Sequence, residues 1–174
     1  MFHKILVAID NSKIARHVFE EALLLAKANA ACLMLLNVIS PFDDQYFNPI
    51  FLQPVNVYPT CRAETLTKCL QQWEELKQNK INFLTSLHNE AIAAGVTVEF
   101  TQNFGVPSRM ICDVARSWEA DLIVMGHRSL TGLSEFFLGS VSNYVLHHAT
   151  CSVLIVDGFS KNVEIVEKKQ ATAA

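Results

Sequence analysis

The sequence predicts an α/β protein in which one open, five-stranded parallel sheet has helices on both faces. Short apolar runs alternate along the chain with stretches whose apolar residues recur every three or four positions, as in successive βαβ units. Most of these runs lack polar alternation, which favours strands buried on both faces of a parallel sheet. A length of 174 residues fits one domain. We expect right-handed crossovers and the strand order 3-2-1-4-5.

The first expected elements are a strand, a helix and a second strand. The run KILVAI at residues 4–9 is short and apolar, and the polar residues Asp10, Asn11 and Ser12 that follow it are candidate helix caps. Apolar residues at helical spacing over residues 12–29 predict an amphipathic helix. The run CLMLLNVI at residues 32–39 predicts the second strand.

An insertion and a long helix are expected next. Residues 40–62 hold four of the five prolines and have no periodic pattern, and their phenylalanines make them too apolar for a solvated linker. Apolar residues at helical spacing predict a helix over residues 63–94 that Gly95 ends. This helix is long enough to extend beyond the sheet or to be broken.

The second half of the chain completes the alternation. VTVEF at residues 96–100 alternates as an edge strand does, and Gly105 and Pro107 lead into a third helix. DLIVMG at residues 121–126 predicts the fourth strand, a helix follows toward His148, and CSVLIV at residues 151–156 predicts the fifth. We therefore expect one domain over residues 1–158 and a polar tail over residues 159–174.

Composition and charge exclude several classes of function. A formal net charge of −3 gives no basic surface for nucleic acid. No stretch reaches the roughly 20 apolar residues of a membrane span, and the N-terminal residues do not form a signal peptide, so we expect a cytoplasmic protein without membrane contact. Five cysteines without a CxxC spacing indicate buried, reduced thiols, and no metal site is expected.

Two polar stretches are expected at the carboxyl ends of the strands, where open α/β sheets bind their ligands. One is Asp10 to Ser12, and the other begins at Gly126 after the fourth predicted strand. Asp10 is suited to two roles, because a carboxylate before a helix stabilises the helix dipole whether or not a ligand binds.

The residues from Gly139 to Ser142 are a candidate phosphate-binding turn. A helix that begins there offers backbone N–H groups and the positive end of its dipole to phosphate oxygens. Hydroxyl groups of Ser140 and Ser142 can donate hydrogen bonds, and His127 or Arg128 can add positive charge. The alternative is that glycine and serine only cap the helix. Neither GxGxxG nor GxxxxGK[ST] is present, and the missing lysine argues against rapid hydrolysis of a nucleoside triphosphate.

Over nearly its whole length the chain resembles the universal stress protein family, a group of adenine-nucleotide-binding α/β proteins with a Rossmann-like sheet. The resemblance rests on KILVAIDNSKIA, LMLLNVI and DLIVMGHRSLTGLSEFFLGSVSNYVLHHATCSVLIV. The last segment is similar to the family's ATP signature of glycine, two residues, glycine, nine residues and Gly-Ser. Gly126, Gly139 and Ser140 match this signature, and Ser129 stands at its second glycine. A Cβ at that glycine costs on the order of 1 kcal/mol if the turn needs a positive φ.

The resemblance implies a ligand, a set of contacts and a homodimer. The ligand is ATP, AMP or another adenine nucleotide, with or without Mg²⁺. The homodimer forms through residues 151–156. The implied contacts are Asp10 and Val38 to adenosine, Met125, Gly126, His127, Arg128 and Ser129 along the ribose and phosphates, and Gly139, Ser140, Val141 and Ser142 at the phosphate tail.

Three functions follow from these observations. The first is a cytoplasmic universal stress protein that binds an adenine nucleotide and acts as a ligand-responsive regulator with little or no turnover. The second is a dimeric stress-response scaffold that binds no nucleotide and acts through the insertion at residues 40–62 and the long second helix. The third is a slow ATPase, for which no general base can be named. The sequence does not identify the protein partner.

Overall fold

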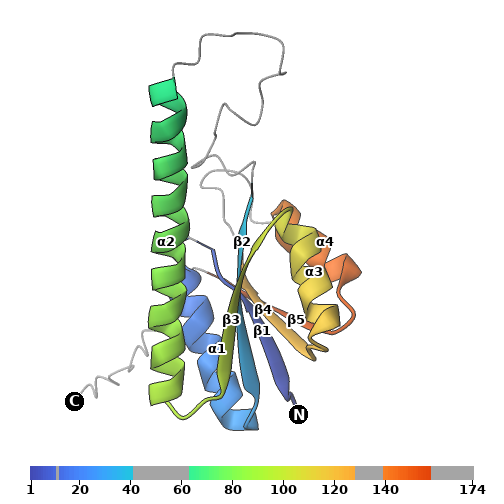
Figure 1. Cartoon of the computed structure of the whole chain (residues 1–174). Helices are drawn as coiled ribbons and strands as arrows, with labels where there is room; N and C mark the ends of the chain where they lie inside the picture. Colours follow the sequence, from blue (N-terminus) through green and yellow to red (C-terminus); the bar gives the residue numbers. More distant parts are fainter. Residues whose placement is uncertain (11, 41–62, 128–138, 158–174) are drawn as a thin grey trace, which may run out of the picture.

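The computed structural model describes residues 1–10, 12–40, 63–127 and 139–157, with the backbone alone at 63–70. Its strands form one sheet in which every neighbouring pair is parallel, in the order β3-β2-β1-β4-β5 (Figure 1). This confirms the predicted fold class and strand order. The strands are β1 (Lys4–Ala8), β2 (Cys32–Ile39), β3 (Val98–Phe104), β4 (Leu122–Gly126) and β5 (Ser152–Val156).

Helices cover both faces of the sheet, as the uninterrupted apolar strands predict (Figure 1). Successive strand residues alternate between the faces. Val7 and Val124 pack in a cluster with residues of α1 and α2, whereas Leu6 and Ile123 pack with residues of α3 and α4. The sheet therefore lies between two hydrophobic layers. The helices are α1 (Ala15–Asn29), α2 (Ala63–Ala93), α3 (Pro107–Ser117) and α4 (Ser140–His148).

Several element ends differ from those expected. Helix α1 begins at Ala15 rather than at residue 12, because the chain first makes a turn at Asp10 and Ser12. Strand β3 covers Val98–Phe104 rather than residues 96–100. Its start is delayed because the N–H of Val96 still donates to the Ala91 carbonyl oxygen at 3.0 Å, which closes the end of α2. Its polar residues are compatible with an edge position, which β3 occupies.

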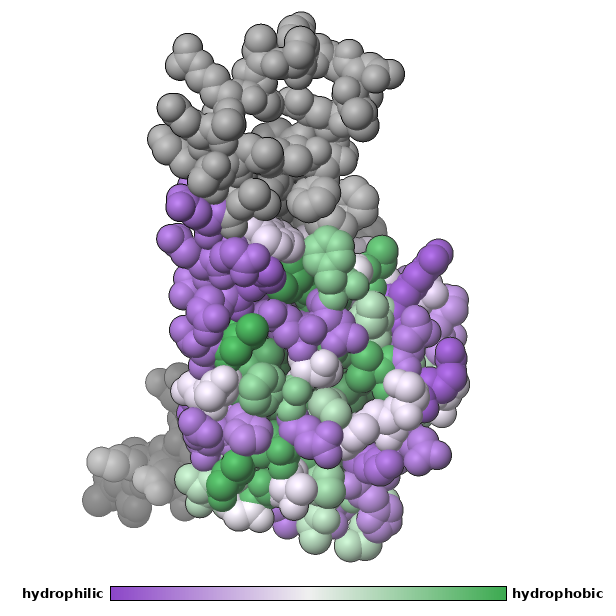
Figure 2. All heavy atoms as spheres, viewed as in Figure 1, coloured by the Kyte–Doolittle hydropathy of each residue, from purple (hydrophilic) through white to green (hydrophobic). Residues whose placement is uncertain are grey.

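Helix α2 is continuous and extends well beyond the carboxyl ends of the strands (Figure 1). Its 31 residues span about 46 Å, whereas the seven residues of β3 span about 23 Å. Hydrophilic side chains run along it on the face shown in Figure 2. Gln71, Glu75 and Gln78 of α2 are exposed. The predicted insertion beyond Ser40 and the predicted tail lie outside the described residues.

Candidate functional site

A cavity of about 450 Å³ lies at the carboxyl ends of β1, β2 and β4. This is the edge at which open α/β sheets bind ligands, and the volume is in the range of small-molecule sites. Residues from α1, α2, α3 and α4 also line it, so both layers of helices contribute to its walls. Eight of the predicted site residues line this one cavity: Asp10, Val38, Met125, Gly126, Gly139, Ser140, Val141 and Ser142.

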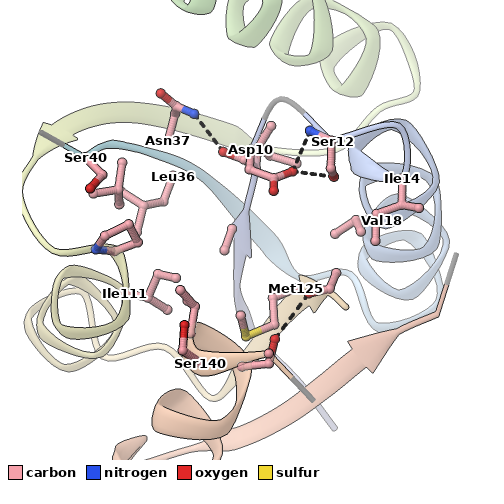
Figure 3. Close-up of a pocket in the computed structure, with 18 of the residues that line it drawn as sticks. Asp10, Ser12, Ile14, Val18, Leu36, Asn37, Ser40, Ile111, Met125 and Ser140 are labelled. Atoms are coloured by element: carbon pink, nitrogen blue, oxygen red, sulfur yellow. Dashed lines mark hydrogen bonds between the residues drawn. The ribbon is translucent and has the colours of Figure 1, made fainter. Parts of the chain in front are cut away.

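Asp10 forms a turn between β1 and α1. Its Oδ1 accepts hydrogen bonds from the backbone N–H of Ser12, at 2.9 Å, and from the Ser12 hydroxyl (Figure 3). The N-cap of α1 is Ile14, which makes no side-chain hydrogen bond to the helix end. The structure therefore shows Asp10 in the turn before the helix rather than as the expected cap of α1, and Asp10 also lines the cavity.

The amino-terminal end of α4 forms another wall of the cavity. Gly139 is its N-cap with φ 57° and ψ 149°, a conformation that is nearly restricted to glycine, and no side chain caps the helix end. The N–H groups of a first helical turn have no partners within the helix. Ser142 is buried, and its hydroxyl donates a long hydrogen bond of 3.5 Å to the Gly126 carbonyl oxygen. The residues from Gly139 to Ser142 therefore place at the cavity the kind of helix end that can accept an anion.

Gly126 is a glycine for a packing reason. A Cβ built on it would lie 2.5 Å from Ile14 Cδ1 and 3.1 Å from Val18 Cγ2. Both of these side chains belong to the start of α1 and line the cavity. The missing side chain of Gly126 thus lets α1 approach β4 closely, next to the turn made by Asp10.

The wall beyond β2 contains polar groups that the sequence reasoning missed. The Asn37 side-chain amide donates to the Ile9 carbonyl oxygen at 2.8 Å, and the Gln102 amide donates to Asn37 Oδ1 at 3.4 Å. Ser40 and Lys80 also line the cavity here, and Lys80 is only 6% exposed. In Figure 3, Asn37 and Ser140 lie on opposite sides of the cavity. A lysine at an otherwise apolar position of α2 was the available sequence signal.

Comparison with known proteins decides the family. A model of the Universal stress protein family matches residues 1–157. The chain belongs to the universal stress protein family. It is 38% identical to the universal stress protein Sll1388 of Synechocystis over 159 residues, which cover 89% of this chain and 97% of that protein.

Two solved universal stress proteins, each with a bound nucleotide, share the fold. One is a universal stress protein in complex with cAMP, with a TM-score of 0.60 and 23% identity over 89% of this chain and 97% of that one. The other is a universal stress protein family protein of Arabidopsis thaliana, At3g01520, with AMP bound. Its TM-score is 0.58, with 21% identity over 92% of this chain and 94% of that one.

Of the residues expected at the site of this universal stress protein, one does not line the cavity, and two lie outside the described residues. His127 follows β4, and its backbone N–H donates to the Val156 carbonyl oxygen at 3.0 Å, but His127 is not among the residues that line the cavity. Arg128 and Ser129 lie outside the described residues. Within the described ranges, the candidate phosphate-binding residues that line the cavity are therefore Gly126 and those at the start of α4.

The structure of this universal stress protein also bears on its cysteines, on metal binding and on membrane spans. Cys32, Cys112 and Cys151 are free thiols, and burial raises the pKa of Cys112 and of Cys151, which disfavours the reactive thiolate. Within the described ranges, no cluster of three or more His, Cys, Asp or Glu side chains is placed to hold a metal. Among the same residues, no helix is both long and apolar enough to cross a membrane.

Proposed function

We propose that this universal stress protein binds an adenine nucleotide in the cavity and acts as a ligand-responsive regulator with little or no turnover. The observation that carries the proposal is the convergence of Asp10, Gly139 and Ser140 on one cavity at the carboxyl edge of the sheet. The solved relatives that hold cAMP and AMP have the same fold, which supports an adenine nucleotide.

The order of the strands suggests how the nucleotide lies. Polar groups follow three adjacent strands: Ser140 after β4, Asp10 after β1 and Ser40 after β2. Neighbouring strands are about 4.8 Å apart, so β4 and β2 are separated by about 10 Å. Phosphates at the α4 helix end place the ribose near Asp10, whose carboxylate accepts hydrogen bonds from hydroxyl groups, and the base beyond β2.

Calorimetric titration of nucleotide-free protein tests the proposal. We expect micromolar binding of AMP or ATP, with much weaker binding of GTP, and the same titrations with and without Mg²⁺ show whether a cation accompanies the phosphates. We expect no more than slow release of phosphate from ATP, because the sequence lacks the lysine of a P-loop. Absence of binding by AMP, ATP and cAMP alike would contradict the proposal and favour the scaffold function.

We further propose a cytoplasmic homodimer that forms through β5. In the part of the chain that the structure describes, β4 is the one strand beside it, and a sheet edge of this kind tends to pair with another strand. Leu154 on β5 is 37% exposed and Leu146 on α4 is 42% exposed, which provides apolar surface at this edge. A two-fold axis would bring the same strand of each copy together.

A charged residue on β5 tests the dimer. We expect Leu154→Lys to convert the dimer to a monomer in sedimentation experiments, because a lysine on an edge strand opposes pairing with a second copy. Leu24→Lys is the matched control, since Leu24 is a more exposed leucine on α1 and its replacement should leave the dimer intact. A wild-type chain that sediments as a monomer would contradict the proposed dimer.

A further inference from the structure

Lys80 is a buried cation in the wall of the cavity. The buried polar or charged residues in the described part of the chain are Asn37, Lys80 and Ser142, and all three line this cavity. Burying a charge in a protein interior is expensive unless its surroundings or a ligand compensate for it. All three therefore add polar groups to the wall of one cavity.

The sequence of α2 brings Lys80 to this position. Leu84, Leu87 and Ala91 are fully buried and form the core-facing stripe of the helix, and Lys80 occupies the next position of the stripe. It lies about 20 Å along the helix from the end of α2 at Ala93, and the seven residues of β3 span about 23 Å. The stripe thus changes from leucine to lysine close to the level at which the strands end and the cavity begins.

Lys80 and the start of α4 come from helices on opposite faces of the sheet. Helix α2 packs on β2 and β3, and its core residues lie in the layer of α1. Helix α4 packs on α3 and β5, and its core residue Val145 lies in the layer on the other face of the sheet. With a phosphate at the start of α4, we therefore expect Lys80 to contact a different part of the nucleotide.

We propose that Lys80, with Ser40 and the buried Asn37, forms a subsite that binds a hydrogen-bond acceptor on the base of the nucleotide. This inference rests on the proposed nucleotide function. An ammonium group has only donors, so its partner is a ring nitrogen of adenine rather than the exocyclic amino group. The Asn37 amide, which is bonded to Ile9 and Gln102, fixes the wall beside which the base lies. Lys80 thereby makes the long helix part of the ligand-binding site.

Titrations with adenosine and AMP test this assignment. Lys80→Met keeps the length of the side chain and removes its charge, and we expect it to weaken the binding of both ligands by the same factor, about 10- to 100-fold. Lys77→Met is the matched control, because Lys77 is on the same helix, pairs with Glu74 and does not line the cavity.

The outcomes separate this subsite from other roles of Lys80. Weaker binding of AMP with unchanged binding of adenosine would place Lys80 on the phosphate and overturn the assignment, as would wild-type affinity of Lys80→Met for both ligands. A wild-type chain that binds neither ligand nor ATP nor cAMP would overturn the proposed function itself, and the subsite with it.

Adenosines that lack one ring nitrogen provide a second test, in which the result that would overturn the subsite needs only the wild-type protein. We expect wild-type protein to bind one of 1-deaza-, 3-deaza- or 7-deaza-adenosine about as weakly as Lys80→Met binds adenosine. The same analogue should lose no further affinity in Lys80→Met, because the interacting pair is already broken. Equal affinity of wild-type protein for adenosine and all three analogues would overturn the subsite.

Discussion

Gly139→Val is expected to abolish the binding of adenine nucleotides. Gly139 has φ 57° and ψ 149°, which a β-branched residue cannot adopt without severe strain, so the turn that begins α4 must change its conformation. Among the described residues, a Cβ at this position meets only the Ser142 hydroxyl oxygen, at 4.0 Å, so the expected effect comes from the backbone conformation. Losing two hydrogen bonds to a charged phosphate costs about 3 to 6 kcal/mol, which is at least a 100-fold loss of affinity.

The chain offers a matched control for this substitution. Gly95 also has a positive φ, of 80°, and a Cβ built on it has no neighbour within 4 Å. It lies between α2 and β3, at the edge of the sheet opposite to the cavity. We expect Gly95→Val to destabilise the fold without changing the affinity for AMP in calorimetry. Wild-type affinity in folded Gly139→Val would show that the start of α4 does not hold the phosphate.

The sequence was sufficient for the fold because the strands of the sheet differ in their patterns. Apolar runs identify β1, β2 and β4, which are the central strands, and also β5, which lies at one edge. Strand β3 contains more polar residues and lies at the other edge. The limits of β3 were less predictable. The sequence predicts that Gly95 ends the helix. The start of the strand is delayed by a hydrogen bond from the Val96 N–H to the Ala91 carbonyl oxygen, and this bond depends on the folded backbone.

The candidate site was predictable where it consists of loops and helix ends. Asp10, Gly126 and the Gly139 to Ser142 turn follow strands directly, so topology alone brings them to one edge. Lys80 was missed because it lies in the middle of a 31-residue helix and reaches the cavity only through the length and packing of α2. Ile14 and Val18 were missed because a sequence pattern does not show that α1 approaches Gly126 so closely.

This close approach gives a second large expected effect, in Gly126→Ala. The added Cβ would lie 2.5 Å from Ile14 Cδ1, 3.0 Å from Ile14 Cγ1 and 3.1 Å from Val18 Cγ2. The end of the Ile14 side chain can rotate, but Val18 is stiff within α1, so the start of the helix must move. We expect the free energy of unfolding, measured by denaturant titration, to fall by about 1 to 3 kcal/mol. The affinity for AMP should fall as well, because Ile14 and Val18 line the cavity.

A double-mutant cycle identifies the contact responsible. Ile14→Val removes Cδ1, the atom nearest to the added Cβ, while the contacts at 3.0 Å and 3.1 Å remain. We therefore expect the double variant to lose less stability than the two single variants together, and to recover part of the affinity for AMP. Strictly additive losses would show that the contact with Ile14 Cδ1 is not responsible for the cost of the added Cβ. If Gly126→Ala instead lowered the affinity for AMP without lowering stability, the glycine would act directly on the ligand rather than through the packing of α1.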